Sequence, residues 1–220
     1  MVHMTADTAG YRDPGMAEST ARPRPGRSDD TRAALLAAAH DLLASEGPGA
    51  LTVRRIAAAA GMSTMNVYSR FGGKDGVLDE LFIDGFRRMT EEMSAAPLTD
   101  DPLEDLRRCG IAYRDFARRN PTYYSLMFDR PVPEFRPSDQ AMETALGALG
   151  RVVSRVERAM DAGLIPRDDP FVIASALWAC DHGLASLEAK TGIADEPLFD
   201  WQRIGDTAID ALVRGLATAR

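Results

Sequence analysis

Hydrophobic residues recur at helical spacing along most of this chain. The first stripe places Leu35, Ala39 and Leu42 on one face at positions i, i+4 and i+7, with Leu36 and Leu43 beside them. No stretch of useful length alternates between hydrophobic and polar residues, as a half-buried β-strand would. The pattern therefore predicts an all-α fold.

Capping residues and chain breaks divide this pattern into separate helices. Ser28, Asp29 and Asp30 suit the start of the first helix, which ends at the break that begins with Gly47. Prolines recur at or near the starts of later segments, where the missing N–H costs nothing. The expected helices span residues 28–46, 52–60, 64–71, 74–86 and onward, 102–120, 121–128, 138–162, 170–190 and 199–219.

The composition is that of a folded globular protein. The chain has 220 residues, of which 45% are hydrophobic and 27% charged, and this excludes a mostly disordered protein. Residues 171–187 are too short for a membrane span and carry Asp181 and His182 at their centre. Residues 1–27 lack the apolar core of a secretory signal. We expect a soluble cytoplasmic protein with no membrane partner.

The charges are distributed unevenly. The net charge of −7 alone argues against nucleic acid as a partner. However, residues 1–74 hold nine Lys or Arg against seven Asp or Glu, whereas residues 75–220 hold 17 against 26. The chain thus has a mildly basic N-terminal part and an acidic body. Residues 1–27 are predicted to form a flexible arm with a basic end, interpreted either as a solvated tail or as an arm that reaches a DNA groove.

Residues 52–71 have the layout of a helix-turn-helix. Thr52 caps the first of two short helices, Gly61 begins a three-residue turn, and Ser63 caps the second helix. Ile56 and Ala59 are expected to pack against Val67 and Phe71. Such units also occur as plain packing modules, so the layout alone leaves both interpretations open.

The outward side of the second short helix carries residue types that read base edges in a DNA groove. Tyr68 and Lys74 suit contacts with phosphates, and the helix starts at Thr52 and Ser63 expose N–H groups that bind anions. The candidate DNA-binding residues are Thr52, Arg54, Ser63, Thr64, Met65, Asn66, Tyr68, Ser69 and Lys74.

Residues 30–80 closely resemble the DNA-binding domain of TetR-type transcriptional regulators. The elements that carry this resemblance are Thr52, Ile56, Ala57, Ala60, Gly61, Ser63, Tyr68, Phe71 and Lys74. The resemblance implies base reading by the start of the helix at 64–71 and phosphate contacts near Thr52, Tyr68 and Lys74. With the arm 1–27, we therefore expect three parts: this arm, a DNA-binding domain 28–80 and a helical effector-binding and dimerisation domain 81–220. Met65-Asn66 and Gly72-Gly73 depart from the common pattern.

Six of the fifteen aromatic residues fall within residues 113–135. This density suggests either an ordinary aromatic core or a cavity for a small, mostly apolar effector. A buried histidine such as His182 is more often a satisfied core residue than a ligand contact. The candidate ligand-binding residues are Phe116, Tyr124, Met127, Phe128, Trp178 and His182.

Two C-terminal helices are expected to form half of a four-helix bundle between two subunits of a homodimer. Residues 171–187 are apolar nearly all round, which indicates burial on several sides. Trp178, His182 and Gly183, with residues 120–128 upstream, are similar to the WHG type of TetR C-terminal domain. The candidate interface residues are Ala176, Ala179, Gly183, Ile204, Ala208, Leu212 and Leu216.

We therefore expect an operator-binding regulator that acts as a repressor and that a small effector releases from DNA. Enzymatic motifs, a metal cluster and a cofactor motif are not found in the sequence, so we expect no enzyme activity, no metal and no cofactor. Two alternatives stay open at this point. One is an all-α enzyme or ligand carrier whose N-terminal unit only packs, and the other is a redox-sensing regulator that uses Cys109 and Cys180.

Overall fold

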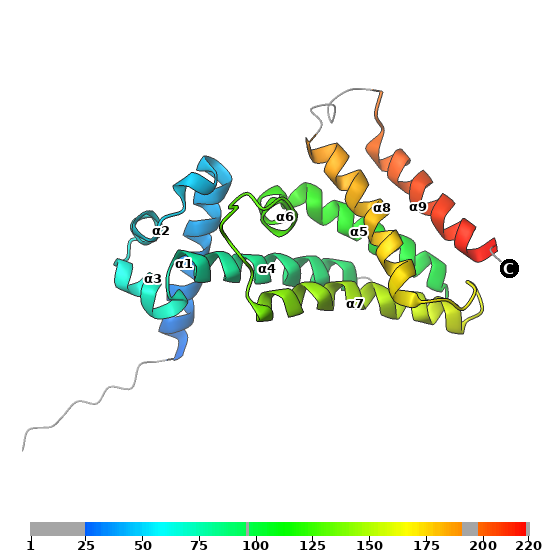
Figure 1. The fold of residues 1–220 in the computed structure, drawn as a ribbon, viewed down its shortest axis with the longest axis horizontal. Helices are drawn as coiled ribbons and strands as arrows, with labels where there is room; N and C mark the ends of the chain where they lie inside the picture. The colour runs from blue at the N-terminus through cyan, green and yellow to red at the C-terminus, as the bar shows by residue number, and fades with distance from the viewer. Residues whose placement is uncertain (1–24, 96, 191–197, 219–220) are drawn as a thin grey trace, which may run out of the picture.

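A computed structural model describes residues 25–95, 97–190 and 198–218 of the chain. Within these residues the fold is all-α, as the hydrophobic spacing predicts, with nine α-helices, one short 3₁₀ helix and no strand (Figure 1). The predicted arm, apart from its last three residues, lies outside the described residues. The helices are α1 (Pro25–Glu46), η1 (Pro48–Ala50), α2 (Val53–Ala59), α3 (Thr64–Phe71), α4 (Lys74–Ser94), α5 (Pro102–Arg119), α6 (Pro121–Phe128), α7 (Asp139–Asp161), α8 (Pro170–Lys190) and α9 (Trp201–Thr218).

The first three helices form a small unit at one end of the molecule (Figure 1). The cap at Thr52 is confirmed, because its hydroxyl oxygen accepts the N–H of Arg55 at 3.2 Å. The predicted start of the first helix is wrong by three residues. Pro25 begins α1, since a proline in the first turn loses no helical hydrogen bond, and Ser28 therefore lies inside the helix.

The long helix α4 joins this unit to the body, where it runs beside α7 (Figure 1). Helix α5 packs between α4, α7 and α8, and α9 lies against α5 and α8 at the far end of the body. Helix α6 crosses α4 at Gly85, where an added Cβ would lie 2.8 Å from Met127 Sδ. The predicted start of α9 at residue 199 is wrong by two residues, because the Asp200 carboxylate accepts the N–H of Arg203 and caps the helix there.

Candidate functional site

The two short helices α2 and α3 pack through a small apolar core. Ile56 and Val67 are fully buried, and Phe71 is nearly so. The prediction that Ala59 joins this core is wrong, because Ala59 is exposed and Ala57 is the buried alanine of α2. The two positions differ by two residues, or about 200° around the helix, so they face opposite sides. The core fixes which side of α3 points outward.

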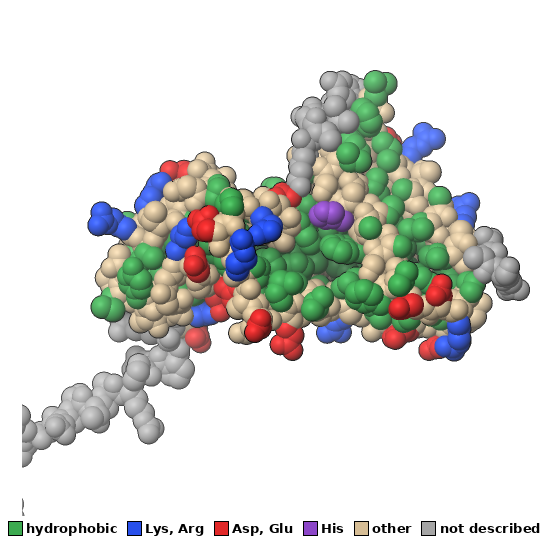
Figure 2. Space-filling view, viewed as in Figure 1, with side chains coloured by type: hydrophobic (Ala, Val, Ile, Leu, Met, Phe, Trp, Pro, Cys, Tyr) green, Lys and Arg blue, Asp and Glu red, His purple; other side chains and the backbone are tan. Residues whose placement is uncertain are grey.

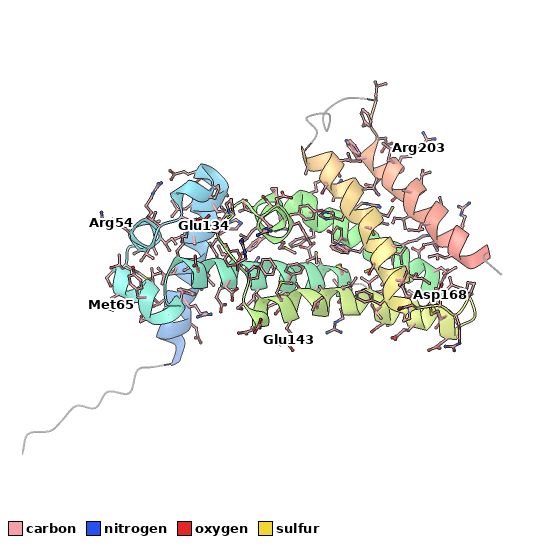
Figure 3. The ribbon with its side chains drawn as sticks, viewed as in Figure 1. Arg54, Met65, Glu134, Glu143, Asp168 and Arg203 are labelled. Carbon is pink, nitrogen blue, oxygen red and sulfur yellow. The ribbon has the colours of Figure 1, made fainter. Side chains whose placement is uncertain are left out.

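The outward side of α3 is polar at most positions and open to solvent. Thr64 and Ser69 are exposed, Met65 is 70% exposed and Tyr68 is 55% exposed. Arg54 of α2 is also exposed, and Figure 3 shows that Arg54 and Met65 project from the same end of the molecule, away from the body. The surface thus combines an exposed cation from α2 with hydroxyl and apolar side chains from α3. Side chains of these types contact phosphates and base edges in DNA grooves.

Asn66 is held by its own helix rather than left free. Its Nδ2 donates to Ser63 Oγ at 3.2 Å, and its Oδ1 accepts from Arg70 Nη1 at 2.9 Å. The prediction that the Ser63 side chain caps α3 is therefore wrong, since its hydroxyl bonds the Asn66 amide and not a backbone N–H. Sequence reasoning missed Arg70, although its i, i+4 spacing from Asn66 is the signal for such a pair.

Lys74, the first residue of α4, binds the body of the protein. Its Nζ lies 3.0 Å from Glu134 Oε1, in the loop between α6 and α7 (Figure 3). Glu134 is exposed, and a hydrogen bond from its own backbone N–H, followed by the one from Lys74, lowers the pKa of its carboxyl. This contact joins residues 60 positions apart, so the sequence alone could not show it.

A cavity of about 580 Å³ lies within the body, between α4, α5, α7 and α8. Its wall is almost entirely apolar, and hydrophobic side chains gather on this face between the N-terminal helices and α8, with Lys or Arg side chains beside them (Figure 2). Met142 and Leu146 of α7 and Trp178 of α8 are partly exposed at its edge, so the cavity opens to solvent. Its size and lining are those of sites for small apolar molecules.

Three of the six predicted ligand-binding residues line this cavity, namely Met127, Phe128 and Trp178. Phe116 and Tyr124 do not line it and are buried in the core. The sequence prediction overlooked the contributions of α4 and α7. The signal was present in α4, where Phe82, Phe86, Met89 and Met93 recur at i, i+4, i+7 and i+11.

His182 does not line the cavity, contrary to the prediction, and belongs to a hydrogen-bonded cluster with two tyrosines. Its Nδ1 is 2.7 Å from Tyr124 Oη and 3.1 Å from Tyr113 Oη. Trp178 Nε1 donates to Tyr113 Oη at 3.3 Å. Burial raises the pKa of Tyr113, so its hydroxyl keeps its proton and bonds as a neutral group. Tyr113 and Trp178 line the cavity, so this cluster joins the cavity wall to Tyr124 of α6 and His182 of α8.

A buried charge pair borders the same cavity. Arg114 Nη1 lies 3.2 Å from Asp181 Oδ1, and Arg114 Nη2 lies 3.1 Å from Asp206 Oδ1, which ties α5 to α8 and α9. The lack of a side chain at Gly110 makes room for Asp181, since an added Cβ would lie 2.6 Å from its Oδ2. Burial raises the pKa of Asp181 to about 6, against the opposing effect of Arg114.

The predicted interface residues divide into two groups. Ala176 and Ala179 of α8 are exposed, and an added Cβ on Gly183 would meet nothing within 4 Å. This side of α8 therefore offers small residues to an approaching helix. On α9 all four predicted residues are half-buried, namely Ile204, Ala208, Leu212 and Leu216. Of these, Leu212 and Leu216 pack against the core of the protomer itself.

An exposed recognition helix in a helix-turn-helix, joined by α4 to a helical body, defines a DNA-binding transcriptional regulator. Residues 35–81 match the model of bacterial regulatory proteins of the tetR family, and residues 106–212 match the model of a tetracyclin repressor-like C-terminal domain. The two segments together cover more than half of the chain, which belongs to the TetR family of transcriptional regulators.

Curated and structural relatives agree with this assignment. Over 130 residues, the chain is 28% identical to HTH-type transcriptional regulators of Mycobacterium bovis and Mycobacterium tuberculosis, which covers 57% of this chain and 54% of each relative. The chain thus spans about half the length of these curated relatives. A protein of unknown function from Rhodococcus sp. RHA1 matches with a TM-score of 0.76 and 28% identity, over 86% of this chain and 96% of that one. The TetR family regulator PfmR from Thermus thermophilus shares the fold, with a TM-score of 0.64 and 20% identity over 83% and 98% of the two chains.

The family consists of regulators rather than enzymes, so the enzyme alternative is not supported. In the described part of the chain, no cluster of side chains could hold a metal ion, and no helix is long and apolar enough to span a membrane. Burial raises the pKa of the Cys109 thiol to about 11 and also raises that of Cys180. Both shifts disfavour the thiolate that redox sensing requires.

Proposed function

We propose that the chain is a homodimeric repressor that an apolar effector releases from its operator when it enters the cavity of the body. The observation that carries this proposal is the loop between α6 and α7, because it contributes to the cavity wall and also contacts the first residues of α4. Phe135 of this loop is buried and lines the cavity, whereas its neighbour Glu134 binds Lys74. A ligand that displaces Phe135 would therefore also move the partner of Lys74.

The end of the loop is anchored to the same helix. Ser138 donates from its backbone N to Asp79 Oδ1 at 2.7 Å and from its hydroxyl to Asp79 Oδ2 at 2.6 Å. Ser138 also caps α7, whose residues form one long wall of the cavity. A change in the position of α7 would thus pull on α4 within its first two turns, directly after the recognition helix.

Helix α6 offers a second route between the cavity and the N-terminal unit. Met127 lines the cavity, and one turn away Tyr123 Oη donates to Asp84 Oδ2 of α4 at 2.5 Å. The Tyr123 ring also lies against His40 of α1, with ring centroids 4.8 Å apart. A shift of α6 would therefore change how α1 and α4 meet. The ligand must bind the two arrangements with different affinities for this mechanism to work.

Dimerisation would occur through α8 and α9, and the two recognition helices would then enter successive major grooves, about 34 Å apart. Ala179→Arg tests this surface, because Ala179 is exposed in the protomer and the larger side chain clashes only with a partner. We expect monomers in sedimentation and weak operator binding. Ser154→Arg on the exposed side of α7 is the matched control and should stay dimeric. Dimers of normal affinity in both variants would contradict the α8 interface.

We further propose that this domain is of the WHG type, as Trp178, His182 and Gly183 suggest.

Fluorescence anisotropy with labelled DNA from upstream of the coding sequence tests the assignment of α3. Tyr68→Ala and Arg54→Ala should weaken binding to all sequences, because we assign both exposed side chains to phosphate contacts. Thr64→Ala should instead relax the preference at particular bases, at about 1–3 kcal/mol. Unchanged affinity and specificity in all three variants would reject the recognition surface.

A further inference from the structure

The cavity extends along two of the helices that line it, α4 and α7. On α4 its lining residues recur from Phe82 to Met93 in one stripe, which at 1.5 Å per residue spans about 16 Å. On α7 they recur from Met142 to Val152, about 15 Å. Helices α4 and α7 lie side by side (Figure 1), and both stripes line the same cavity, which therefore extends as a channel along the two helices. Such a shape suits a linear chain better than a compact ring system.

The charges on the cavity wall differ in how far they are compensated. Asp181 is buried and paired with Arg114. Arg136 donates from Nη1 to the carbonyl oxygens of Pro133 and Phe135, so these bonds hold its guanidinium against its own loop. Arg130 is exposed at the edge of the cavity, and within the described part of the chain it forms neither a hydrogen bond nor an ion pair. The mouth of the channel thus carries an uncompensated positive charge.

The backbone at Arg130 is held in an unusual conformation. Its φ is 52°, and it is the only non-glycine residue with a positive φ in the described part of the chain. Left-handed backbone at a residue with a long side chain is costly and tends to occur at ligand sites. Here it directs the chain from the end of α6 into the loop that lines the cavity.

We infer that the channel binds a linear amphipathic anion, with its apolar chain along α4 and α7 and its carboxylate on Arg130. This inference rests on the proposed function and names the ligand class of the same cavity. A planar guanidinium can donate two parallel N–H bonds to a carboxylate, which gives both affinity and orientation. Asp181, on the α5 and α8 side of the cavity, is already paired with Arg114, so this side offers no free cation to an anionic end, which favours entry of the apolar end first.

Isothermal titration of the full chain with three ligands of equal chain length tests the inference. The probes are dodecanoate, dodecan-1-ol and dodecyltrimethylammonium, at a pH where the carboxylate is ionised and below their micelle concentrations. We expect dodecanoate to bind about tenfold more tightly than the alcohol, the effect of one charge-assisted hydrogen bond, and the cation to bind most weakly. Arg130→Gln should remove the preference and leave the affinity for the alcohol unchanged. Arg130→Lys should keep part of it.

Arg87→Gln is the matched control, because Arg87 is an exposed arginine of α4 that does not line the cavity. Equal affinity for carboxylate and alcohol in the wild type, or a preference that survives Arg130→Gln, would overturn the head-group assignment while leaving the cavity as the ligand site. Leu149→Trp fills the channel and should abolish binding of all three probes, with ligand-free operator binding as the check on folding. If this folded variant still bound the probes, or if the wild type bound none of them, the proposed effector site itself would be wrong.

Discussion

Lys74 Nζ lies 3.0 Å from Glu134 Oε1, so the residue that follows the recognition helix and its turn is bound to the loop that lines the cavity. A phosphate of the operator and the Glu134 carboxylate would compete for the same ammonium group. Both partners are partly solvated, so this ion pair contributes little to the stability of the fold. Its importance is that Lys74 can bind either the Glu134 carboxylate or a phosphate of the operator, but not both at once.

The Glu134→Gln variant should therefore bind operator DNA more tightly in the absence of ligand. The substitution frees Lys74 for phosphate and removes a negative charge near the DNA, so the slope of log affinity against log salt should steepen by about one. Fluorescence anisotropy across a salt series measures both quantities. Glu143→Gln on the exposed side of α7 removes the same charge elsewhere and is the control (Figure 3). If both variants shifted affinity equally, the effect would be one of overall charge and not of the Lys74 contact.

Gly85→Ala should destabilise the protein by about 1–3 kcal/mol, because the new Cβ would lie 2.8 Å from Met127 Sδ and 3.1 Å from Tyr123 Cδ1. The clash pushes α6 away from α4 and should also weaken operator binding. Gly147→Ala is the matched helical control, since nothing lies within 4 Å of its added Cβ. There the gain in helix propensity should stabilise the protein by about 0.5–1 kcal/mol. Urea unfolding measures both changes, and equal signs would contradict the close packing at Gly85.

Asp181 should make stability depend on pH in a direction opposite to that of a surface carboxylate. Its pKa is about 6 in the folded protein and near 3.8 in the unfolded chain, so between these values the folded state binds the extra proton. The free energy of unfolding should then fall as pH rises from about 4 to about 6, by about 1–3 kcal/mol from this group.

Asp181→Asn isolates this contribution, because the amide does not titrate. The difference in unfolding free energy, variant minus wild type, should rise across the same pH range and level off above it. Urea unfolding at several pH values measures it. A difference that stays constant with pH, or that falls, would show that Arg114 keeps Asp181 ionised throughout.

Local signals in the sequence predict the helices well, and most of the outward side of α3. The cap at Thr52 and the buried pair Ile56 and Val67 follow from spacing within a few turns. Errors of two or three residues arose at helix starts, where a proline at residue 25 or an aspartate at residue 200 decides the boundary. The buried alanine of α2 is Ala57 and not the predicted Ala59, which shows that an error of two positions is enough to move a residue to the opposite face of a helix.

The cavity was harder to predict, because its walls come from helices far apart in the chain. A cluster of aromatic residues marked the region, but side chains such as Phe116 point into the core while Trp178 lies at the edge of the cavity. The contact between Lys74 and Glu134 depends on how α6 leaves the body, which has no local signature. Pairing across such distances is set by tertiary packing and not by spacing.

Thermodynamic linkage between the cavity and the DNA-binding surface tests the central claim most directly. The affinity for dodecanoate, or for dodecan-1-ol if it binds more tightly, is measured by titration with and without saturating operator DNA. The account predicts that operator weakens ligand binding by about 5- to 150-fold, and that ligand weakens operator binding by the same factor. Equal ligand affinity in the free and DNA-bound protein would contradict the coupling between the cavity and the recognition helix.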